Sequence, residues 1–219
     1  MTEITEYITN DFKAIDSHDS IAAVHDFFND LHFTHFPVIE EGIYIGSIAA
    51  DDIETFDDGK KVSDYKYTLE GFFARTNTIW LDVLEIFAKN NTNLIPVLDE
   101  NNSYVGYYEI VDIMKFFHET PFLKEPGRIL IVKKEILDYS MSQITQIVES
   151  NNGRLLGLFI SEADVTTIQI TMKISLGALN EIIQTFRRYN YDIISNHPED
   201  NYINSLKERS DYLDKYLNI

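Results

Sequence analysis

The stretch that decides the fold is Phe36-Pro37-Val38-Ile39, because it returns as Ile95-Pro96-Val97-Leu98 about sixty residues later. The same offset relates three further pairs: Ile4-Thr5-Glu6-Tyr7 with Val62-Ser63-Asp64-Tyr65, Gly46 with Gly106, and Asp52 with Asp112. A repeat of this length indicates two copies of one supersecondary unit, which bury their apolar faces against each other. Such a pair leaves two related clefts, and clefts are where small ligands bind.

Each copy is expected to contain a helix, two strands and a second helix. Ser20 and Thr78 are the predicted N-caps of the first helices, because apolar residues follow each of them at helical spacing. The predicted strands cover residues 36–39 and 43–48 in the first copy, and 94–98 and 104–108 in the second. The last helix of each copy has an acidic first turn, with Asp51 and Asp52 in one copy and Glu109 and Asp112 in the other.

The pattern changes after a predicted linker over residues 121–127, and the order of elements becomes βαββαβ. This order is that of a ferredoxin-like domain. The predicted strands are residues 129–132, 155–160, 168–174 and 191–195. Ser140 and Gln143 predict a capping box at the first helix, and apolar spacing predicts the second helix over 179–186. A last helix with an apolar seam is predicted over 201–219, where it docks on a neighbouring domain or subunit.

Composition limits the function classes. The chain has 36 acidic and 18 basic residues and a formal charge of −18, which repels nucleic acids and anionic membranes. It has no cysteine, so disulfides, zinc thiolates and thiol catalysis are excluded. The segment after Met1 lacks the basic and apolar regions of a signal peptide, and the apolar runs are only strand-sized. We therefore expect a cytoplasmic protein that binds neither nucleic acid nor membrane.

The repeated strands and the two Gly-to-Asp stretches resemble the CBS domain, a cystathionine-β-synthase-type module. The segment after Gly127 resembles an ACT domain by its topology. This order of domains resembles the AcuB-type acetoin-utilisation proteins. The resemblance implies an α+β fold and a homodimer, since tandem CBS modules form a pseudo-twofold pair that often dimerises as a flat disc. The expected domains are 1–60 and 61–120 for the CBS repeats, 127–197 for the ACT-like domain and 201–219 for the C-terminal helix.

The resemblance also implies which residues bind a ligand. CBS modules often bind adenosine nucleotides through Gly, a hydroxyl residue three positions later, and Asp three positions after that. The hydroxyl and the Asp contact the ribose, and apolar strand residues enclose the adenine. Here Ala49 and Glu109 stand at the hydroxyl position. The candidate ligand-binding residues are therefore Gly46, Asp52 and Phe36 in the first copy, and Gly106, Asp112, Ile95 and Glu109 in the second.

Two interpretations of these residues stay open. The charge of Glu109 opposes a phosphate unless a cation such as Mg²⁺ intervenes, so the Glu109 cleft is expected to be the poorer phosphate site. In the other interpretation the acids only complement helix dipoles and bind nothing. The ACT-like segment has Tyr139-Ser140 where amino-acid-binding relatives usually have glycine, which favours a dimerisation module over an amino-acid sensor.

No pattern in the chain pairs a nucleophile with a base or forms a phosphate-binding loop, so we expect no catalytic residues and no enzyme activity. The histidines His18, His25, His32 and His35 lack converging ligands, so no metal site is expected and they are interpreted as surface or interface residues. The leading hypothesis is a regulatory module that senses a small molecule, with an adenosine nucleotide in the CBS clefts and no other cofactor. The alternative is a non-catalytic homodimeric interaction scaffold with degenerate clefts.

Overall fold

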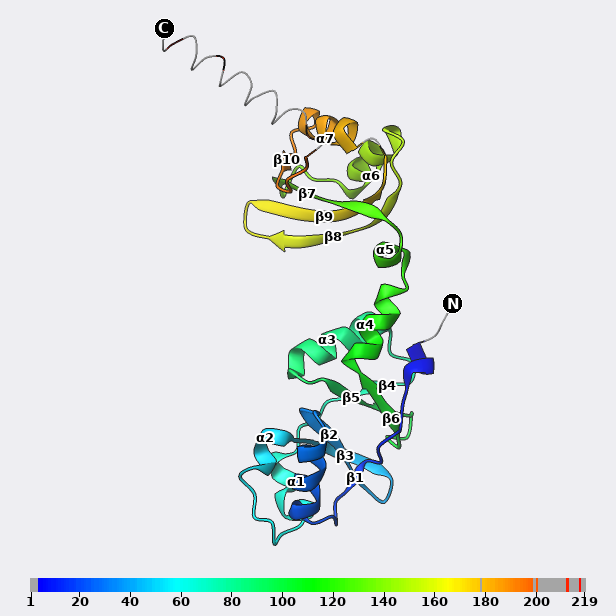
Figure 1. The fold of residues 1–219 in the computed structure, drawn as a ribbon, viewed down its shortest axis with the longest axis vertical. Coiled ribbons are helices and arrows are strands. Elements are labelled where there is room, and N and C mark those ends of the chain that lie inside the picture. The colour runs from blue at the N-terminus through cyan, green and yellow to red at the C-terminus, as the bar shows by residue number, and fades with distance from the viewer. Residues whose placement is uncertain (1–3, 178, 199, 201–211, 213–216, 218–219) are drawn as a thin grey trace. The chain divides into compact units, whose positions relative to one another are not determined.

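The computed structural model describes residues 4–177, 179–198, 200, 212 and 217. The chain forms two compact units, Met1–Phe117 and His118–Ile219 (Figure 1). The helix predicted over 201–219 lies outside the described residues, apart from Tyr212 and Leu217.

The first repeat is a small sheet with two helices. Its elements are β1 (Ile15–Asp16), α1 (Ile21–Asp30), β2 (His35–Glu40), β3 (Ile43–Ala49) and α2 (Ala50–Ile53). The sheet has the order β1-β2-β3, with β1 parallel and β3 antiparallel to β2. Ser20 caps α1 as predicted, since its side chain accepts a hydrogen bond from Ala23 N at 3.3 Å. The repeat-1 core packs around the fully buried Ile21, Phe36 and Ile48.

The second repeat has the same topology, which confirms the duplication. Its elements are β4 (Ala74–Arg75), α3 (Trp80–Asn90), β5 (Leu94–Leu98), β6 (Tyr104–Glu109) and α4 (Ile110–His118), and its sheet has the order β4-β5-β6. Two details differ from expectation. The N-cap of α3 is Ile79, because the Thr78 hydroxyl accepts a hydrogen bond from Arg75 N (2.8 Å). Glu109 is the last residue of β6 and not part of the following helix.

The opening segment of each copy packs on the other copy. These segments contain the 3₁₀ helices η1 (Ile4–Tyr7) and η2 (Val62–Thr68). Ile4 is buried in the repeat-2 core beside Val83 and Ile113, whereas Val62 and Tyr65 are buried in the repeat-1 core. Each repeat therefore depends on the opening segment of the other copy, and the two repeats form one unit.

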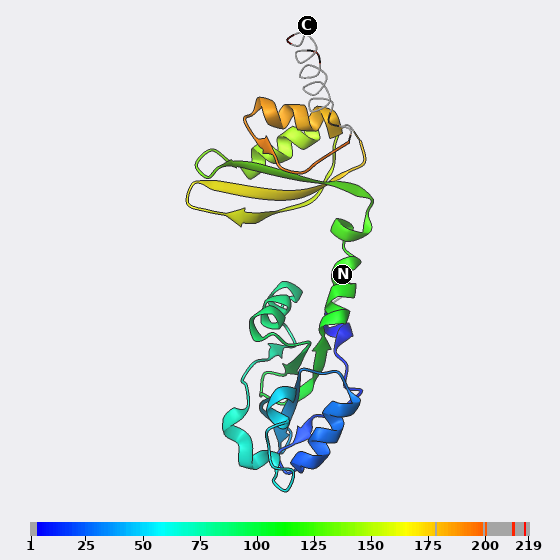
Figure 2. The same ribbon diagram turned by 60° about the vertical axis from the view of Figure 1, so that its left-hand side comes forward.

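The C-terminal unit confirms the predicted βαββαβ order. A short helix, α5 (Pro121–Lys124), precedes β7 (Gly127–Glu135), α6 (Met141–Ser150), β8 (Leu155–Ala163), β9 (Thr167–Ser175), α7 (Leu179–Arg188) and β10 (Asp192–Ile193). The antiparallel sheet has the order β10-β7-β9-β8. Helices α6 and α7 cover one face of it (Figures 1 and 2). Leu130, Met172, Ile183 and Phe186 are fully buried in the core between them.

Two local predictions in the C-terminal unit were wrong. The expected linker over 121–127 contains α5, whose Phe122 ring packs on Phe159 at 6.2 Å between centroids, and it ends inside β7. Only half of the predicted capping box forms. The Ser140 hydroxyl accepts from Gln143 N (3.4 Å), but the Gln143 side chain accepts from the Tyr191 hydroxyl (3.1 Å).

Candidate ligand sites

The two repeats place equivalent residues where the last strand of each sheet, β3 or β6, meets the helix that follows it, α2 or α4. We call the first junction site 1, defined by His35, Ala49, Asp52, Glu70 and Phe72, and the second site 2, defined by Thr9, Asp11, Leu94, Glu109 and Asp112. The strand registers make them equivalent, since His35 pairs with Ala49 as Leu94 pairs with Glu109. The opening segments complete both sites, because Ser47 bridges to Glu70 as Tyr107 bridges to Thr9.

The predicted glycines Gly46 and Gly106 let the opening segments approach the strands. A Cβ on Gly46 would lie 2.7 Å from Leu69 Cβ, and Gly46 has φ +145°, which side chains rarely tolerate. A Cβ on Gly106 would lie 2.5 Å from the carbonyl oxygen of Thr9. Both glycines are therefore required for the packing of the opening segments, whether or not a ligand is present.

The predicted apolar residues Phe36 and Ile95 lie in the repeat cores. Both are 0% exposed, with Phe36 in the repeat-1 core and Ile95 in the repeat-2 core. Successive side chains of a strand point to opposite faces. The neighbours that share a strand face with Ala49 and Glu109 are therefore His35 and Leu94.

The two aspartates have different surroundings. Asp52 is half-buried in the four-residue α2, and its backbone carbonyl accepts bonds from the Thr55 backbone N (3.0 Å) and hydroxyl (2.8 Å). Asp112 lies in the first turn of α4 with a side chain that is 26% exposed, and its Oδ1 accepts from Lys115 Nζ at 2.8 Å. A ligand at Asp112 has to share this carboxylate with Lys115.

Site 2 contains three carboxylates, whereas site 1 contains two, Asp52 and Glu70. Burial raises the pKa of the Glu109 carboxyl, the charges of Asp112 and Asp11 raise it further, and Lys115 opposes them. The three carboxylates of site 2 therefore lie close enough to influence one another, and one ammonium group, that of Lys115, opposes their charge. Such a potential disfavours an incoming phosphate. Within the described part of the chain, no three or more His, Asp or Glu side chains gather in an arrangement suited to a metal ion.

Site 1 contains two residues that sequence reasoning missed, His35 and Glu70. His35 was interpreted as a surface or interface residue, but it is only 9% exposed, and its Nε2 lies 3.4 Å from Glu70 Oε1. Tyr44 holds the segment that carries Glu70, since its hydroxyl donates to the Phe72 carbonyl oxygen (2.8 Å). Burial raises the pKa of Tyr44 to about 12, so the phenol stays protonated for this bond. The pairing of β2 with β3, which places His35 opposite Ala49, is the feature that could have identified His35.

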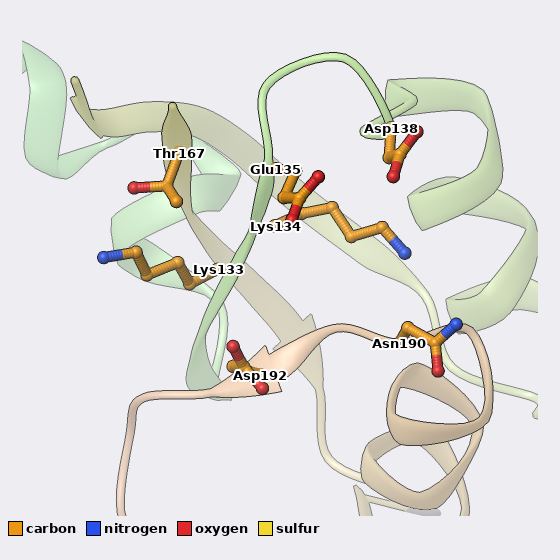
Figure 3. Close-up of a pocket in the computed structure, with 7 residues that line it drawn as sticks. All are labelled: Lys133, Lys134, Glu135, Asp138, Thr167, Asn190 and Asp192. Atoms are coloured by element: carbon orange, nitrogen blue, oxygen red, sulfur yellow. The ribbon is translucent and has the colours of Figure 1, made fainter. Parts of the chain in front are cut away.

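The C-terminal unit has a cavity of about 420 Å³ beside the loop between β7 and α6. Figure 3 shows its lining: Lys133, Lys134, Glu135, Asp138, Thr167, Asn190 and Asp192. The two lysine side chains point in opposite directions (Figure 3). Lys134 donates to the Tyr189 carbonyl oxygen and lies 4.6 Å from the centroid of the Tyr191 ring. The lining thus combines charges of both signs, with one of its two ammonium groups already engaged.

Residues 4–56 and 72–119 match the family model of the CBS domain. The two matches correspond to the two repeats, so the N-terminal unit is a tandem CBS domain pair. None of the described helices is both long enough and apolar enough to cross a membrane.

An uncharacterized protein of Methanocaldococcus jannaschii is 25% identical to this chain over 153 residues, 69% of this chain and 57% of that protein. This chain therefore spans little more than half of that relative.

Solved structures that match part of this chain include a CBS domain pair/ACT domain protein from Thermotoga maritima, with 18% identity and a TM-score of 0.49 over 54% of this chain and 98% of that one. They also include CBSX2 in complex with AMP, with 16% identity and a TM-score of 0.46 over 53% of this chain and 96% of that one.

Proposed function

We propose that this chain is a non-catalytic regulatory module whose CBS pair senses an adenosine nucleotide, with Asp52 and Asp112 as the ribose-binding residues. The observation that carries the proposal is the equivalent placement of these two aspartates. Each lies in the first turn of a helix that directly follows a strand, six positions after a glycine that is packed against an opening segment. A carboxylate in this position can accept hydrogen bonds from both ribose hydroxyls, and its charge is favoured at a helix start.

Site 1 is the better nucleotide site in this proposal. Ala49 carries no charge at the hydroxyl position, whereas Glu109 adds a carboxylate at the same position of site 2. Site 2 takes an uncharged adenosine group, or a nucleotide whose phosphates are neutralised by Mg²⁺. Phe36 and Ile95 make no direct ligand contact in this proposal, because both side chains are fully buried; they contribute to the cores that hold β2 and β5 in place.

The C-terminal unit acts in this proposal as an ACT-like dimerisation domain, in the domain order of the AcuB-type proteins. The chain is a homodimer in the cytoplasm. Exposed apolar side chains on α3, its N-cap and α4 provide the contact surface of the CBS pair: Ile79 is 63% exposed, Leu81 58%, Val111 55% and Met114 47%. Association is stabilised when a partner covers solvent-exposed apolar side chains of this size.

The second candidate function is a homodimeric interaction scaffold whose ligand sites are degenerate. Glu109 and the pairing of Asp112 with Lys115 favour it, because both reduce what site 2 offers to a nucleotide. The cavity beside the β7–α6 loop, with charges of both signs, offers a further place for a small zwitterion such as an amino acid.

A thermal-shift screen of the full chain separates these functions. We expect AMP, ADP or ATP, with and without Mg²⁺, to raise the midpoint of thermal unfolding, because a ligand that binds only the folded state stabilises it. Guanosine nucleotides serve as the matched control. A flat response to every adenosine compound up to millimolar concentration supports the scaffold and contradicts the sensor.

A further inference from the structure

In site 1 the nearly buried His35 faces the partly exposed Glu70. The His35 ring is nearly covered: its Nδ1 lies 3.1 Å from Thr34 Oγ1, and its edge meets the Phe72 ring with 5.4 Å between centroids and an interplanar angle of 82°. Its Nε2 faces Glu70 Oε1 at 3.4 Å. The imidazole is thus held by its surroundings, with Nε2 directed at a carboxylate.

Glu70 is held differently from His35. Its backbone is fixed, because Glu70 N donates to the Ser47 carbonyl oxygen and Ser47 N donates to the Glu70 carbonyl oxygen, both at 2.8 Å. Its side chain is 47% exposed, and the 3.4 Å separation exceeds the 2.7–2.9 Å usual for a charge-assisted hydrogen bond. The carboxylate can therefore rotate into solvent at little cost while the imidazole stays in place.

Site 2 has neither partner. Leu94 stands at the position of His35, and Thr9 at the position of Glu70, by the strand registers and the two bridges. Leu94 is 0% exposed. The described residues therefore give the two sites different chemistry on one backbone frame, because only site 1 has an imidazole that faces a carboxylate.

We propose that His35 is the phosphate-binding residue of site 1 and that Glu70 is its internal competitor. A ligand phosphate takes the place of the Glu70 carboxylate at His35 Nε2, while Glu70 turns outward. This inference rests on the proposed function and adds a specificity to it: site 1 distinguishes adenosine phosphates from adenosine, and His35 makes the distinction. The carboxylate sets the threshold, because only an anion that binds the imidazole better than Glu70 displaces it.

The test uses variants that copy site 2 into site 1. Glu70→Thr and His35→Leu introduce the residues that the same fold accepts at the equivalent positions, and His35→Gln is a second variant that retains a polar side chain. Each is made in full-length Asp112→Ala protein, so that the heats report site 1. The affinities of adenosine, AMP and ATP are measured by calorimetry. Glu85→Gln is the control for loss of one paired surface carboxylate, since Glu85 contacts Lys89 at 2.5 Å.

We expect Glu70→Thr to strengthen AMP and ATP binding about twofold to fivefold. We expect His35→Leu and His35→Gln to weaken it about tenfold. Adenosine affinity should stay the same in all three variants. Equal changes for adenosine and AMP, unchanged affinities, or the same gain in Glu85→Gln would overturn this inference and leave the proposed function standing. Absence of binding by all three compounds, in the parent protein and every variant, would overturn both.

Discussion

Thr34 and Asn93 occupy equivalent positions in the two repeats and are joined by reciprocal hydrogen bonds. Thr34 N donates to Asn93 Oδ1 (2.9 Å), and Asn93 N donates to Thr34 Oγ1 (3.1 Å). Each also gives its backbone carbonyl to the helix of its own repeat, since Ala50 N donates to Thr34 O and Ile110 N donates to Asn93 O. This pair therefore ties the pseudo-twofold centre of the CBS pair to the helices that carry Asp52 and Asp112.

Asn93→Ala should lower the stability of the CBS pair. The change removes the acceptor for Thr34 N and the donor to the His32 carbonyl oxygen (2.7 Å). Each lost bond contributes about 1 kcal/mol, so we expect a loss of about 1–2 kcal/mol and a fall of a few degrees in the midpoint of thermal unfolding. Exposed Asn77→Ala is the control. Equal midpoints for both variants and the parent would show that the link contributes nothing.

Gly46 and Gly106 lie where the opening segments pack closely on the strands. Gly46→Ala and Gly106→Ala should each destabilise the chain by about 1–3 kcal/mol, because their Cβ atoms would overlap Leu69 and Thr9. Gly71→Ala is the matched control, because a Cβ at Gly71 meets nothing within 4 Å and the residue lies in the same opening segment as Leu69. Thermal unfolding of the three variants measures the effect. If Gly71→Ala is as damaging as the other two, close approach is not the reason for the glycines.

The duplication made much of the fold predictable. The strands around Pro37 and Pro96 and the βαββαβ order follow from local apolar patterns, and both appear in the structure. The exchange of opening segments could not be predicted from the sequence, because each copy has the pattern of an uninterrupted unit. Long-range contacts, such as the bridge between Thr9 and Tyr107, show that each opening segment packs on the other copy. Such contacts carry no periodic signal.

The site was harder to predict than the fold. The spacing from Gly46 to Asp52 predicted a ligand site at this junction, and that site stays a prediction, whereas the structure places Phe36 fully buried in the repeat-1 core. Competing partners explain the other misses. Thr78 binds Arg75 N and leaves the α3 N-terminus uncapped, and Gln143 binds Tyr191 across the core of the C-terminal unit. The choice among hydrogen-bond partners depends on tertiary structure.

Glu109 should make stability depend on pH. Its folded pKa is raised, so its contribution to stability is fully present below the pKa of an unfolded glutamate and is lost as pH rises through the folded pKa. The variant Glu109→Gln has no carboxyl to deprotonate at this position, so it does not lose this stability as pH rises. The unfolding midpoint of the variant should therefore match the parent near pH 4 and exceed it near pH 7. Exposed Glu100→Gln controls for the net charge, and a pH-independent difference for Glu109→Gln would contradict the prediction.

The dimer should depend on the exposed face of α4. Val111→Glu combined with Met114→Glu places two charges on this face and should convert a dimer into a monomer at micromolar concentration, as measured by light scattering. Val165→Glu is the control, since Val165 is 94% exposed in the turn between β8 and β9. A monomeric parent protein would refute the homodimer, and a dimer that survives the double variant would place the contact elsewhere.

Calorimetric titration of the full chain with AMP, and with ATP with and without Mg²⁺, decides whether Asp52 and Asp112 bind the ribose of an adenosine nucleotide. Removal of either carboxylate should cost about 1.5–3 kcal/mol at its own site, which is about a tenfold to hundredfold loss of affinity there. Asp52→Ala should affect the tighter site and Asp112→Ala the weaker one, while Asp51→Ala, beside Asp52 but exposed, should change neither. If the parent protein binds no adenosine nucleotide, or if both aspartate variants keep unaltered affinity, Asp52 and Asp112 are not ribose-binding residues.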